Sequence, residues 1–389
     1  MTTLLDLVII GSGPAGISTA LHLLKIDPSW ARRLLVLEKA THPRPKLCGG
    51  GLTRLGVRVL QELGFEWPLP LPQVYIEDAR LVYTGRTVHV RARPEFVVFQ
   101  RAELDAYLAG QARQRGVVIH EDEPVQSFTL GKRSVTICTA KATYQTQALV
   151  AADGSNGITR RTLNRSERHE RVARLLEVLY SAIATSDGHA GRYARFDFTP
   201  TSQSLQGYSW DFPTWMYNQV GHNRGVYDAR IAPKRPRTNL KSILNQELGL
   251  PETGSQAGKL AGYPIHLFSP ANRFALPRLV LVGDAAGADP LFGEGIGPAL
   301  SYGKVAANAI QDAFAQQDFS FRQYPQQVLL SPVGRYLLIR WAVAWWAYRL
   351  SGQPWFMHLI WTLGAGLASV WPQPKPLPEP LLKPPHKSG

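Results

Sequence analysis

Apolar residues at the start of the chain form continuous runs. The first run, Leu4 to Ile10, is followed by a glycine-rich segment, Gly11 to Gly16, and then by apolar residues at helical spacing. A second run, Leu34 to Leu37, ends at Glu38. Continuous apolar runs of this length are typical of strands that are buried on both faces of a parallel sheet. The pattern therefore predicts a strand, a glycine turn, a helix and a second parallel strand.

Farther along, apolar and polar residues alternate. The alternation covers Val74 to Phe99 and, with many aromatic residues, Leu175 to Ile231. It predicts antiparallel strands that face a core on one side. Arg101 to Arg115 has helical spacing, and the apolar run Leu279 to Val282 precedes a glycine-rich turn and a helix from about Gly297 to Phe314. The late apolar run predicts a return of the chain to the first sheet.

These patterns predict an α/β fold: a Rossmann-like dinucleotide-binding domain with an inserted antiparallel β-sheet domain for the substrate and a C-terminal helical region. The predicted segments are 1–72, 101–170 and 270–330 for the first domain, 73–100 and 171–269 for the second, 331–371 for a Trp-rich helical region, and 372–389 for a proline-rich tail.

Composition narrows the class of protein. The hydrophobic fraction of 44% is enough for a packed core, and 43 Lys and Arg against 29 Asp and Glu give a net charge of +14. The positive charge favours anionic partners, but no run of five basic residues occurs, so we do not expect nucleic acid binding. The two cysteines, Cys48 and Cys138, predict no disulfide framework, and no basic leader precedes the first strand. We therefore expect a cytoplasmic protein.

The glycine-rich segment carries the pattern GxGxxG, in the residues Gly11, Gly13, Pro14, Ala15 and Gly16. Between a strand and a helix, such a turn lets backbone amides and the helix dipole approach a pyrophosphate. Glu38 stands at the end of the next strand, 22 residues after Gly16, and is followed by Lys39. Its carboxylate can accept hydrogen bonds from an adenosine ribose. The sequence predicts an ADP-containing dinucleotide, either NAD or FAD.

Two further motifs at the ends of predicted strands distinguish FAD from NAD. Leu149 to Gly154 ends in Asp-Gly, and the run from Leu281 to Gly287 contains Gly-Asp. Together with the glycine pattern, they resemble the fingerprints of glutathione-reductase-type FAD oxidoreductases of the para-hydroxybenzoate hydroxylase class. The resemblance implies that FAD is the cofactor. It also implies that Asp284 binds the ribitol, that Asp153 supports the pyrophosphate and that Arg101 reaches the adenylate.

The segment from Asp289 to Gly297 leads into the late helix with exposed backbone amides. By the same resemblance, these amides face the pyrimidine edge of the flavin, where donors stabilise the anionic reduced form. No metal ligand is predicted. The predicted cofactor-binding residues are Gly11, Gly13, Pro14, Ala15, Gly16, Glu38, Lys39, Cys48, Gly49, Gly50, Arg101, Asp153, Gly283, Asp284, Gly295 and Ile296.

Two local motifs indicate which flavoenzyme this is. Pro45 to Leu52 contains KxCGG, and Gly207 to Pro213 contains YxWxFP. Both resemble elements of the geranylgeranyl reductase family, over roughly residues 4–330. The resemblance implies an FAD-dependent oxidoreductase that reduces carbon-carbon double bonds of an isoprenoid or prenyl lipid. Because no second GxGxxG occurs, the electron donor is left open between NADPH and another reduced carrier.

Three residues are candidates for catalysis. Cys48 is a small polarizable residue among glycines, where it lines the site or donates a proton. Tyr208 and Trp210 are two positions apart on a predicted strand, so they project to the same face. There they would wall an apolar tunnel with one hydroxyl available. Lys46 is interpreted as a solvated loop charge.

Two other functions fit the same fingerprints. A flavin-dependent monooxygenase or halogenase uses them too, although Tyr208 and Phe212 replace the Trp and Ile of the halogenase element WxWxIP. A flavoprotein electron carrier to a membrane quinone is the second alternative. The sequence leaves both open.

Trp residues gather in Arg335 to Trp371, a segment with few acidic residues. The seventeen residues from Trp355 to Trp371 reach the lower bound for a membrane span. Three arginines in the preceding stretch, Arg335, Arg340 and Arg349, suit a helix lying on anionic headgroups better than one that spans a bilayer. We expect a hydrophobic or lipid substrate with a peripheral membrane contact; the alternative is a helical cap over the substrate domain.

Overall fold

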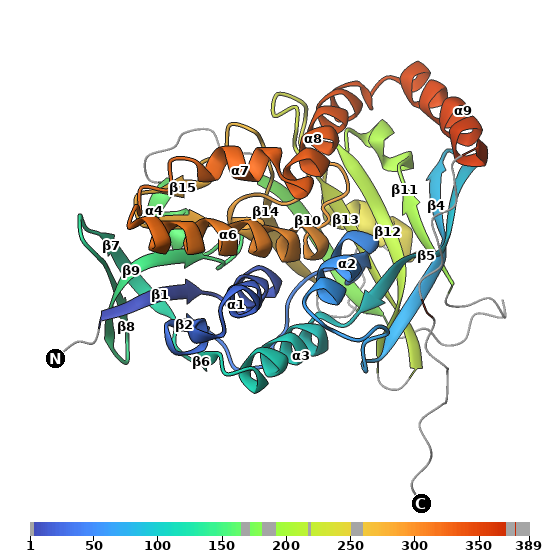
Figure 1. The fold of residues 1–389 in the computed structure, drawn as a ribbon. Coiled ribbons are helices and arrows are strands. Elements are labelled where there is room, and N and C mark those ends of the chain that lie inside the picture. Colours follow the sequence, from blue (N-terminus) through green and yellow to red (C-terminus); the bar gives the residue numbers. More distant parts are fainter. Residues whose placement is uncertain are drawn as a thin grey trace, which may run out of the picture.

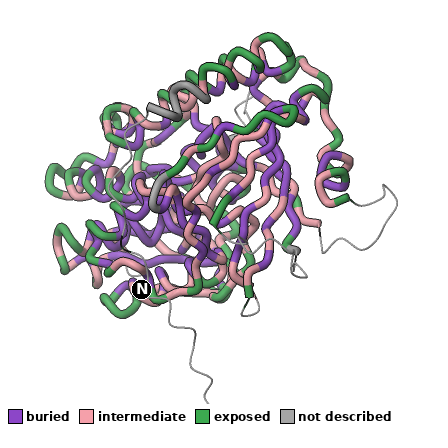
Figure 2. The backbone as a smooth tube through the Cα atoms, turned by 90° about the vertical axis from the view of Figure 1, so that its right-hand side faces the viewer, coloured by how far each residue is buried: buried purple, intermediate pink, exposed green. Residues whose placement is uncertain are grey.

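The computed structural model describes residues 4–164, 172–180, 192–216, 219–249, 260–370 and Pro378. These residues form two layers of sheet with helices around them (Figure 1). The predicted proline-rich tail, 372–389, lies outside the described residues except for Pro378. Buried residues concentrate along the strands of both sheets, and exposed residues on the outer helices (Figure 2).

The first sheet is the predicted parallel sheet. β2 and β16 are fully apolar and buried, and β1 and β9 end in apolar buried residues, which is typical of a sheet covered on both faces. The parallel strands lie in the order β16, β9, β1, β2 and β6, with bounds Leu279–Leu281, Thr143–Ala151, Leu4–Ile10, Leu34–Leu37 and Val118–His120. β15 (Ala275–Leu276) and the hairpin β7 (Val125–Leu130) and β8 (Val135–Thr139) pair antiparallel at its margins.

Helices cover this sheet. Pro14 at the first turn preorganises helix α1 (Pro14–Ile26), because its fixed φ suits a helix start and its missing N–H would have no partner there. In α3 (Arg101–Gln114) the predicted apolar residues Leu104, Leu108 and Ala112 are all buried. The late helix α6 (Ile296–Gln316) packs against α1, and η1 (Pro28–Arg32), η3 (Gly283–Ala285) and α7 (Tyr324–Leu330) complete this layer.

The second sheet has the order β14, β10, β13, β12, β11, β4, β5, β3, with bounds Ala261–His266, Val172–Tyr180, Gln219–Asp228, Gly207–Met216, Tyr193–Asp197, Gln73–Tyr83, Arg86–Phe99 and Gly51–Thr53. It differs from the expectation in two ways. The pair β11 and β4 is parallel rather than antiparallel. β3 lies within the segment 1–72 expected in the first domain, but it pairs with β5 of the second sheet.

Two C-terminal helices, α8 (Pro332–Leu350) and α9 (Pro354–Val370), run along one end of the second sheet (Figure 1). Trp361 of α9 packs against Tyr83 and Phe198, so this region is anchored to the aromatic core. Among the shorter helices, α4 (Ile158–Asn164) leads from the first sheet to the second, whereas α2 (Arg54–Glu62), η2 (Thr199–Gln203) and α5 (Leu240–Leu248) connect strands of the second sheet.

Candidate flavin site

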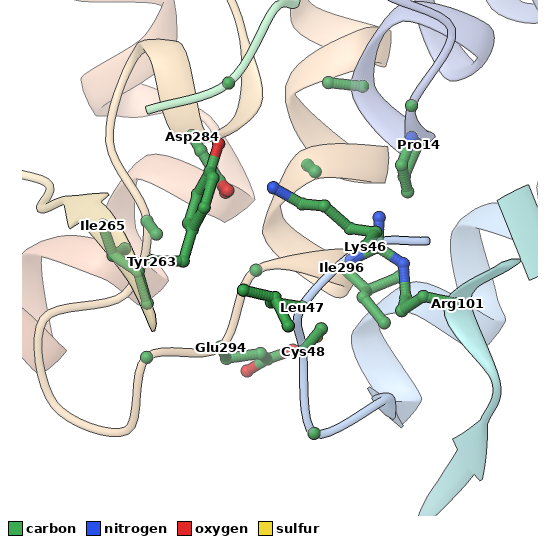
Figure 3. A pocket seen from close by; sticks show the side chains of 18 of the residues that line it. Pro14, Lys46, Leu47, Cys48, Arg101, Tyr263, Ile265, Asp284, Glu294 and Ile296 are labelled. Atoms are coloured by element: carbon green, nitrogen blue, oxygen red, sulfur yellow. The ribbon is translucent and has the colours of Figure 1, made fainter. Parts of the chain in front are cut away.

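A cavity of about 800 Å³ lies between the two sheets, which is within the usual range for ligand pockets. One part, here called the cofactor half, is walled by the glycine turn and the ends of parallel strands; it includes Gly11, Gly13, Glu38, Arg44, Asp153 and Asp284. The other part, the substrate half, is walled by the second sheet, the turn before α6 and helix α8; it includes Ala79, Leu81, Val90, Glu95, Phe96, Phe196, Tyr208, Phe212, Phe292 and Arg340. The loop of Cys48 lies between the two halves (Figure 3).

The three glycines of the turn have different roles. Gly11 has φ +101°, and an added Cβ atom would lie 2.5 Å from the carbonyl oxygen of Ala152. At Gly16 an added Cβ would lie 2.0 Å from the carbonyl oxygen of Gly11. At Gly13 the nearest atom would be 3.7 Å away, on the Arg44 side chain. Gly11 and Gly16 therefore permit the packing of the turn, whereas Gly13 opens toward the cavity as a pyrophosphate cradle requires.

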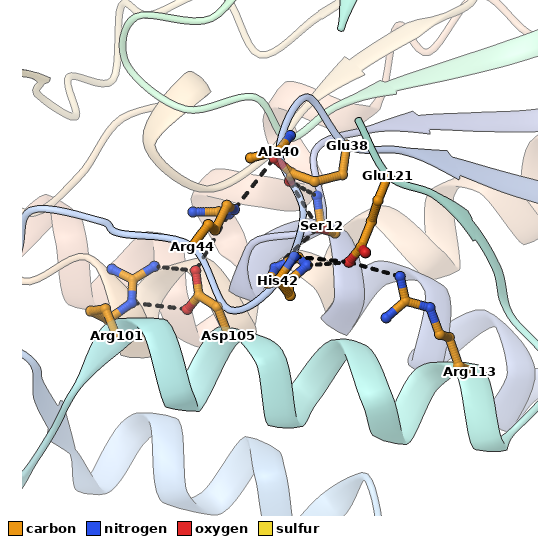
Figure 4. Close-up of polar contacts among 9 residues, drawn as sticks. All are labelled: Ser12, Glu38, Ala40, His42, Arg44, Arg101, Asp105, Arg113 and Glu121. Atoms are coloured by element: carbon orange, nitrogen blue, oxygen red, sulfur yellow. Dashed lines mark hydrogen bonds and ion pairs between the residues drawn. The ribbon is translucent and has the colours of Figure 1, made fainter. Parts of the chain in front are cut away.

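Glu38 is buried and held by protein donors (Figure 4). One carboxylate oxygen accepts hydrogen bonds from Ser12 N at 2.9 Å and Ser12 Oγ at 2.8 Å. Arg44 Nε lies 3.3 Å from the other oxygen. The predicted contact of Glu38 with a ribose stays a prediction, and these contacts fix the carboxylate at the cavity wall.

Arg101 also lines the cavity, but its guanidinium is paired with Asp105, at 2.9 Å and 3.0 Å. It also lies against the thiol of Cys48. Arg44 reaches the same Asp105 at 3.4 Å and so links it to Glu38. The guanidinium of Arg101 is therefore not free, and its expected contact with an adenylate stays a prediction.

Asp284 is half-buried and lines the cavity after β16. Across the described ranges, no hydrogen bond or ion pair is found for its carboxylate, which leaves it able to accept bonds from the hydroxyls of a polyol. Nearby, Gly295 and Ile296 bring the start of α6 to the same wall. These features, with the open face at Gly13, fit the pyrophosphate, ribitol and flavin ring of FAD.

Asp153 is both a cap and a wall residue. One oxygen accepts a hydrogen bond from Thr159 N at 2.8 Å, while the other is buried without a partner in the structure. Burial raises the pKa of Asp153 above its ordinary value. The unpartnered oxygen suits a donor from a bound ligand.

The loop of Cys48 is fixed by the second sheet. Cys48 N donates to Glu177 Oε1 at 3.1 Å, and Asn223 Nδ2 donates to the Cys48 carbonyl at 3.2 Å. Trp210 Nε1 donates to Asn223 Oδ1 at 2.8 Å. An added Cβ at Gly50 would lie 2.1 Å from the Phe99 carbonyl oxygen. The two motifs KxCGG and YxWxFP are thus one unit: the sheet motif holds the backbone of the loop motif.

Glu177 on β10 sits behind this loop. It is 4% exposed, and burial raises its pKa to about 7 despite the hydrogen bond from Cys48 and the charges of Arg101 and Lys46. Its Oε2 is buried without a hydrogen-bond partner in the structure. Glu177 therefore changes charge near neutral pH directly behind the loop.

The substrate half is built from aromatic side chains. Phe196 contacts Phe96, Tyr208, Phe212 and Phe292, with ring centroids between 5.0 and 6.3 Å apart. The sequence expected the Tyr208 hydroxyl to be available to a ligand; instead it donates to the carbonyl of Phe292. Tyr208 and Trp210 line the cavity through their rings, and Trp210 also positions the loop.

Of the predicted residues, Gly16 and Gly283 are not in the cavity wall. An added Cβ at Gly283 would lie 2.7 Å from the Cβ of Ala15, so this glycine permits helix packing. Lys46, interpreted as a solvated loop charge, is partly buried, and its ammonium nitrogen lies 3.9 Å from the centroid of the Tyr263 ring. The roles proposed for the other residues stay predictions.

Sequence reasoning missed several polar groups at or behind the wall: Arg44, Glu177, Asn223, Tyr263, Glu294 and Arg340. Glu294 was visible as the single acidic residue among the glycines before α6. Arg44 lies in the same loop as Cys48 but carries no motif of its own, and the remaining four reach the site from strands and a helix distant in the sequence.

A glycine turn, an acidic residue on the next parallel strand and an Asp facing the cavity define a dinucleotide-binding flavoprotein. The chain belongs to the family described as FAD binding domain, whose model matches residues 5–301. FAD is thus its cofactor. Among its relatives, the menaquinone reductase of Mycobacterium tuberculosis is 28% identical, with 78% of this chain and 76% of that protein aligned. The digeranylgeranylglycerophospholipid reductase of Methanococcus vannielii is 23% identical over 81% and 79% of the two chains.

Solved structures agree on the fold. The geranylgeranyl bacteriochlorophyll reductase-like protein of Thermoplasma acidophilum has a TM-score of 0.74, with 20% identity over 94% of this chain and 90% of that one. The halogenase PltM, in complex with phloroglucinol and FAD, has a TM-score of 0.68, with 16% identity over 94% and 82%. The predicted resemblance is confirmed: the chain is a geranylgeranyl reductase-like, FAD-dependent oxidoreductase.

Proposed function

We propose that this enzyme reduces carbon-carbon double bonds in the prenyl chain of a hydrophobic quinone or lipid. The observation that carries the proposal is the substrate half, an apolar aromatic chamber that opens beside the Cys48 loop. Such a chamber excludes water and holds an uncharged chain at the edge of the flavin site. Two relatives are named as reductases of a menaquinone and of a digeranylgeranyl lipid, which supports the same substrate class.

The charges of the substrate half support a chain without a charged group at this end. Among its wall residues, Arg340 is the cation, and its Nη1 is already paired with buried Asp289 at 2.7 Å. A diphosphate placed here would be poorly neutralised, and burying an unpaired charge is costly. We therefore infer that the prenyl chain enters this half and that any polar headgroup stays outside.

When bound, reduced FAD supplies a hydride. The residues of the chain must then hold the alkene at reacting distance, exclude water and provide a proton, since an isolated alkene is a poor hydride acceptor.

Anaerobic single-turnover experiments test the function. FAD-loaded protein, reduced with dithionite, is mixed with menaquinone in vesicles, with a digeranylgeranyl glycerophospholipid, or with geranylgeranyl diphosphate. Flavin oxidation together with a mass gain of two hydrogens per saturated bond in the prenyl chain supports the proposal. Quinone-ring reduction with unchanged chains would favour the electron carrier. Oxygen-dependent formation of a flavin adduct and a hydroxylated or halogenated product would favour the monooxygenase or halogenase.

NADPH is our proposed electron donor, and it would have to bind without a Rossmann domain of its own. Anaerobic bleaching of the flavin by NADPH, compared with NADH and a low-potential reductant such as reduced ferredoxin, decides this. Faster bleaching by NADPH than by NADH or ferredoxin supports NADPH as the electron donor. Bleaching by reduced ferredoxin alone contradicts it.

We also propose that α8 and α9 rest on an anionic bilayer. Their outward residues include Ile339, Val343 and Trp346 on α8 and Trp355 and Leu359 on α9, between 47% and 66% exposed. The sequence from 332 to 370 contains no Asp or Glu. Two exposed arginines, Arg335 and Arg349, flank the α8 face. In the part of the chain that the structure describes, no helix has both the length and the apolarity to cross a bilayer.

Cosedimentation with vesicles containing phosphatidylglycerol tests this contact. Trp346→Ser combined with Trp355→Ser should lower binding, and salt should weaken the wild-type binding by screening the headgroups. Ile26→Ser, at an exposed apolar position of α1, is the matched control and should leave binding unchanged. Equal binding of all three proteins, or none by the wild type, would favour the helical cap.

A further inference from the structure

The acidic residue before α6, Glu294, lies where the two halves of the cavity meet. It lines the cavity, its side chain is 7% exposed, and it precedes Gly295 and Ile296 at the start of the helix. Figure 3 labels it with Cys48 and Leu47 of the loop among the residues that line the same cavity. It is thus a carboxyl group at the boundary between the flavin site and the substrate chamber.

Two hydroxyl groups from different parts of the chain bond to this carboxyl. Thr53 Oγ1 on β3 lies 2.5 Å from Oε1, and the Tyr336 hydroxyl on α8 bonds to Oε2. The side chain of Glu294 is therefore held at both oxygens. The half-buried Tyr336 extends from it to α8, toward the protein surface.

The cation nearest to Glu294, Arg340, pairs mainly with another carboxylate, Asp289. Arg340 Nη2 lies 3.9 Å from Glu294, but Arg340 Nη1 lies 2.7 Å from Asp289, whose side chain is fully buried. The nearby negative charge of Asp289 and the burial both favour a neutral Glu294. Burial is the larger cause, and it raises the pKa of Glu294 above its ordinary value.

The thiol of Cys48 is engaged differently. Its Sγ accepts a hydrogen bond from Gly50 N at 3.4 Å, and the guanidinium of Arg101 lies against it. Both contacts place donors around the sulfur. Glu294 also accepts hydrogen bonds from two hydroxyls, but its burial raises its pKa and so favours the protonated form that a proton donor needs.

We propose that Glu294 is the proton donor for the double-bond reduction and that Tyr336 carries replacement protons to it. The inference rests on the proposed function. One alkene carbon takes the hydride from the two-electron-reduced flavin, and the other takes the carboxyl proton of Glu294, so the π bond becomes two C–H bonds. The remaining carboxylate regains a proton from water by way of the Tyr336 hydroxyl.

Glu294→Gln tests the proposal with the FAD-loaded enzyme, because Gln keeps the shape of the side chain without an acidic proton. We expect FAD affinity to change by less than about threefold and the anaerobic single-turnover rate at pH 7 to fall by about 100-fold or more. Asp228→Asn is the matched control: Asp228 is buried, burial raises its pKa, and it lies outside the cavity wall. The single-turnover rate of Asp228→Asn should stay at the wild-type level.

The pH profile supplies a readout that a structural role would not move. The single-turnover rate should fall as pH rises through the raised pKa of Glu294. Tyr336→Phe removes a donor to the charged carboxylate, which raises that pKa further. The falling limb should therefore move to higher pH in Tyr336→Phe, and an unmoved limb contradicts the role of the pair.

Infrared spectra of the apoprotein test the protonation of Glu294 without any turnover. A neutral-carboxyl band present at pH 7 in the wild type and absent in Glu294→Gln supports the inference, and identical spectra overturn it. If the wild type saturates no prenyl chain, the proposed function itself fails. If the wild type is active and Glu294→Gln matches it while Cys48→Ala loses the rate, the proton comes from the thiol and only this inference is overturned.

Discussion

The two halves of the cavity are built by different means. The cofactor half uses backbone: two glycines that permit close packing, one that opens a cradle, and the start of α6. The substrate half uses side chains, mainly aromatic rings from β5, β11 and β12 and from the segment before α6. Backbone recognition suits a cofactor whose shape does not vary. Side chains from separate strands can be exchanged one at a time, so we propose that the second half sets the substrate.

The contrast between two glycines of the cofactor half gives the largest expected effect. Gly11→Ala forces a side chain onto a backbone with φ +101° and into contact with the Ala152 carbonyl, which should cost about 3 kcal/mol or more of unfolding free energy. Gly13→Ala has room for its methyl group, so its stability should change by less than about 1 kcal/mol. Thermal denaturation of the apoproteins measures both, and equal melting temperatures would contradict this division of roles.

Gly13→Ala should nevertheless weaken FAD binding, by about tenfold or more, because its methyl group occupies the cradle. Flavin fluorescence titration measures this. Unchanged affinity would mean that the pyrophosphate does not lie against Gly13.

The boundary between the halves should respond to pH through Glu177. Its pKa is about 7 in the folded protein against an ordinary value of 4.5, so the folded state binds the proton more tightly. The free energy of unfolding should therefore fall as pH rises between these values, by up to about 3 kcal/mol in total. Glu177→Gln removes this loss, so it should be more stable than wild type at pH 8 and similar to it at pH 4.5. A constant stability difference across that range would show that Glu177 does not titrate there.

Asp284→Ala tests whether the cofactor half also depends on one charged side chain. Loss of a charge-assisted hydrogen bond costs about 1.5 to 3 kcal/mol, which corresponds to an increase in the FAD dissociation constant of about 10-fold to 150-fold. The melting temperature of the apoprotein should not fall, because the carboxylate has no hydrogen bond or ion pair among the described residues. A normal FAD content in the purified variant would refute the assignment.

The smallest effect is expected where the substrate half holds the loop. Asn223→Ala removes the bridge between the Trp210 indole and the Cys48 carbonyl and should destabilise the protein by about 1 to 2 kcal/mol. FAD should still bind, while prenyl-chain reduction slows because the loop is less ordered. Asn245→Ala, a buried Asn on α5 outside the cavity wall, is the control for stability alone. Equal turnover in the two variants would show that the order of the Cys48 loop does not affect the rate of reduction.

The sequence by itself determined the backbone of the cofactor half. The βαβ start, the glycine turn, the strand ends at Asp153 and Asp284 and the helix after Gly295 depend on neighbours within a few residues. Such local rules of backbone geometry leave a readable pattern. The same locality made KxCGG and YxWxFP recognisable as separate motifs.

Only the tertiary structure decided how those motifs meet. The bond from Trp210 through Asn223 to Cys48, the buried Glu177 behind the loop, and the contacts of Glu294 with Thr53 and Tyr336 join residues from different sheets and helices. No periodicity records these partners, because each depends on where distant strands cross. The bond of the Tyr208 hydroxyl to the Phe292 carbonyl and the contact of the Lys46 ammonium with the Tyr263 ring were not predicted for that reason. A side chain's availability is fixed by what packs against it, and in this protein those partners come from up to about two hundred residues away in the chain.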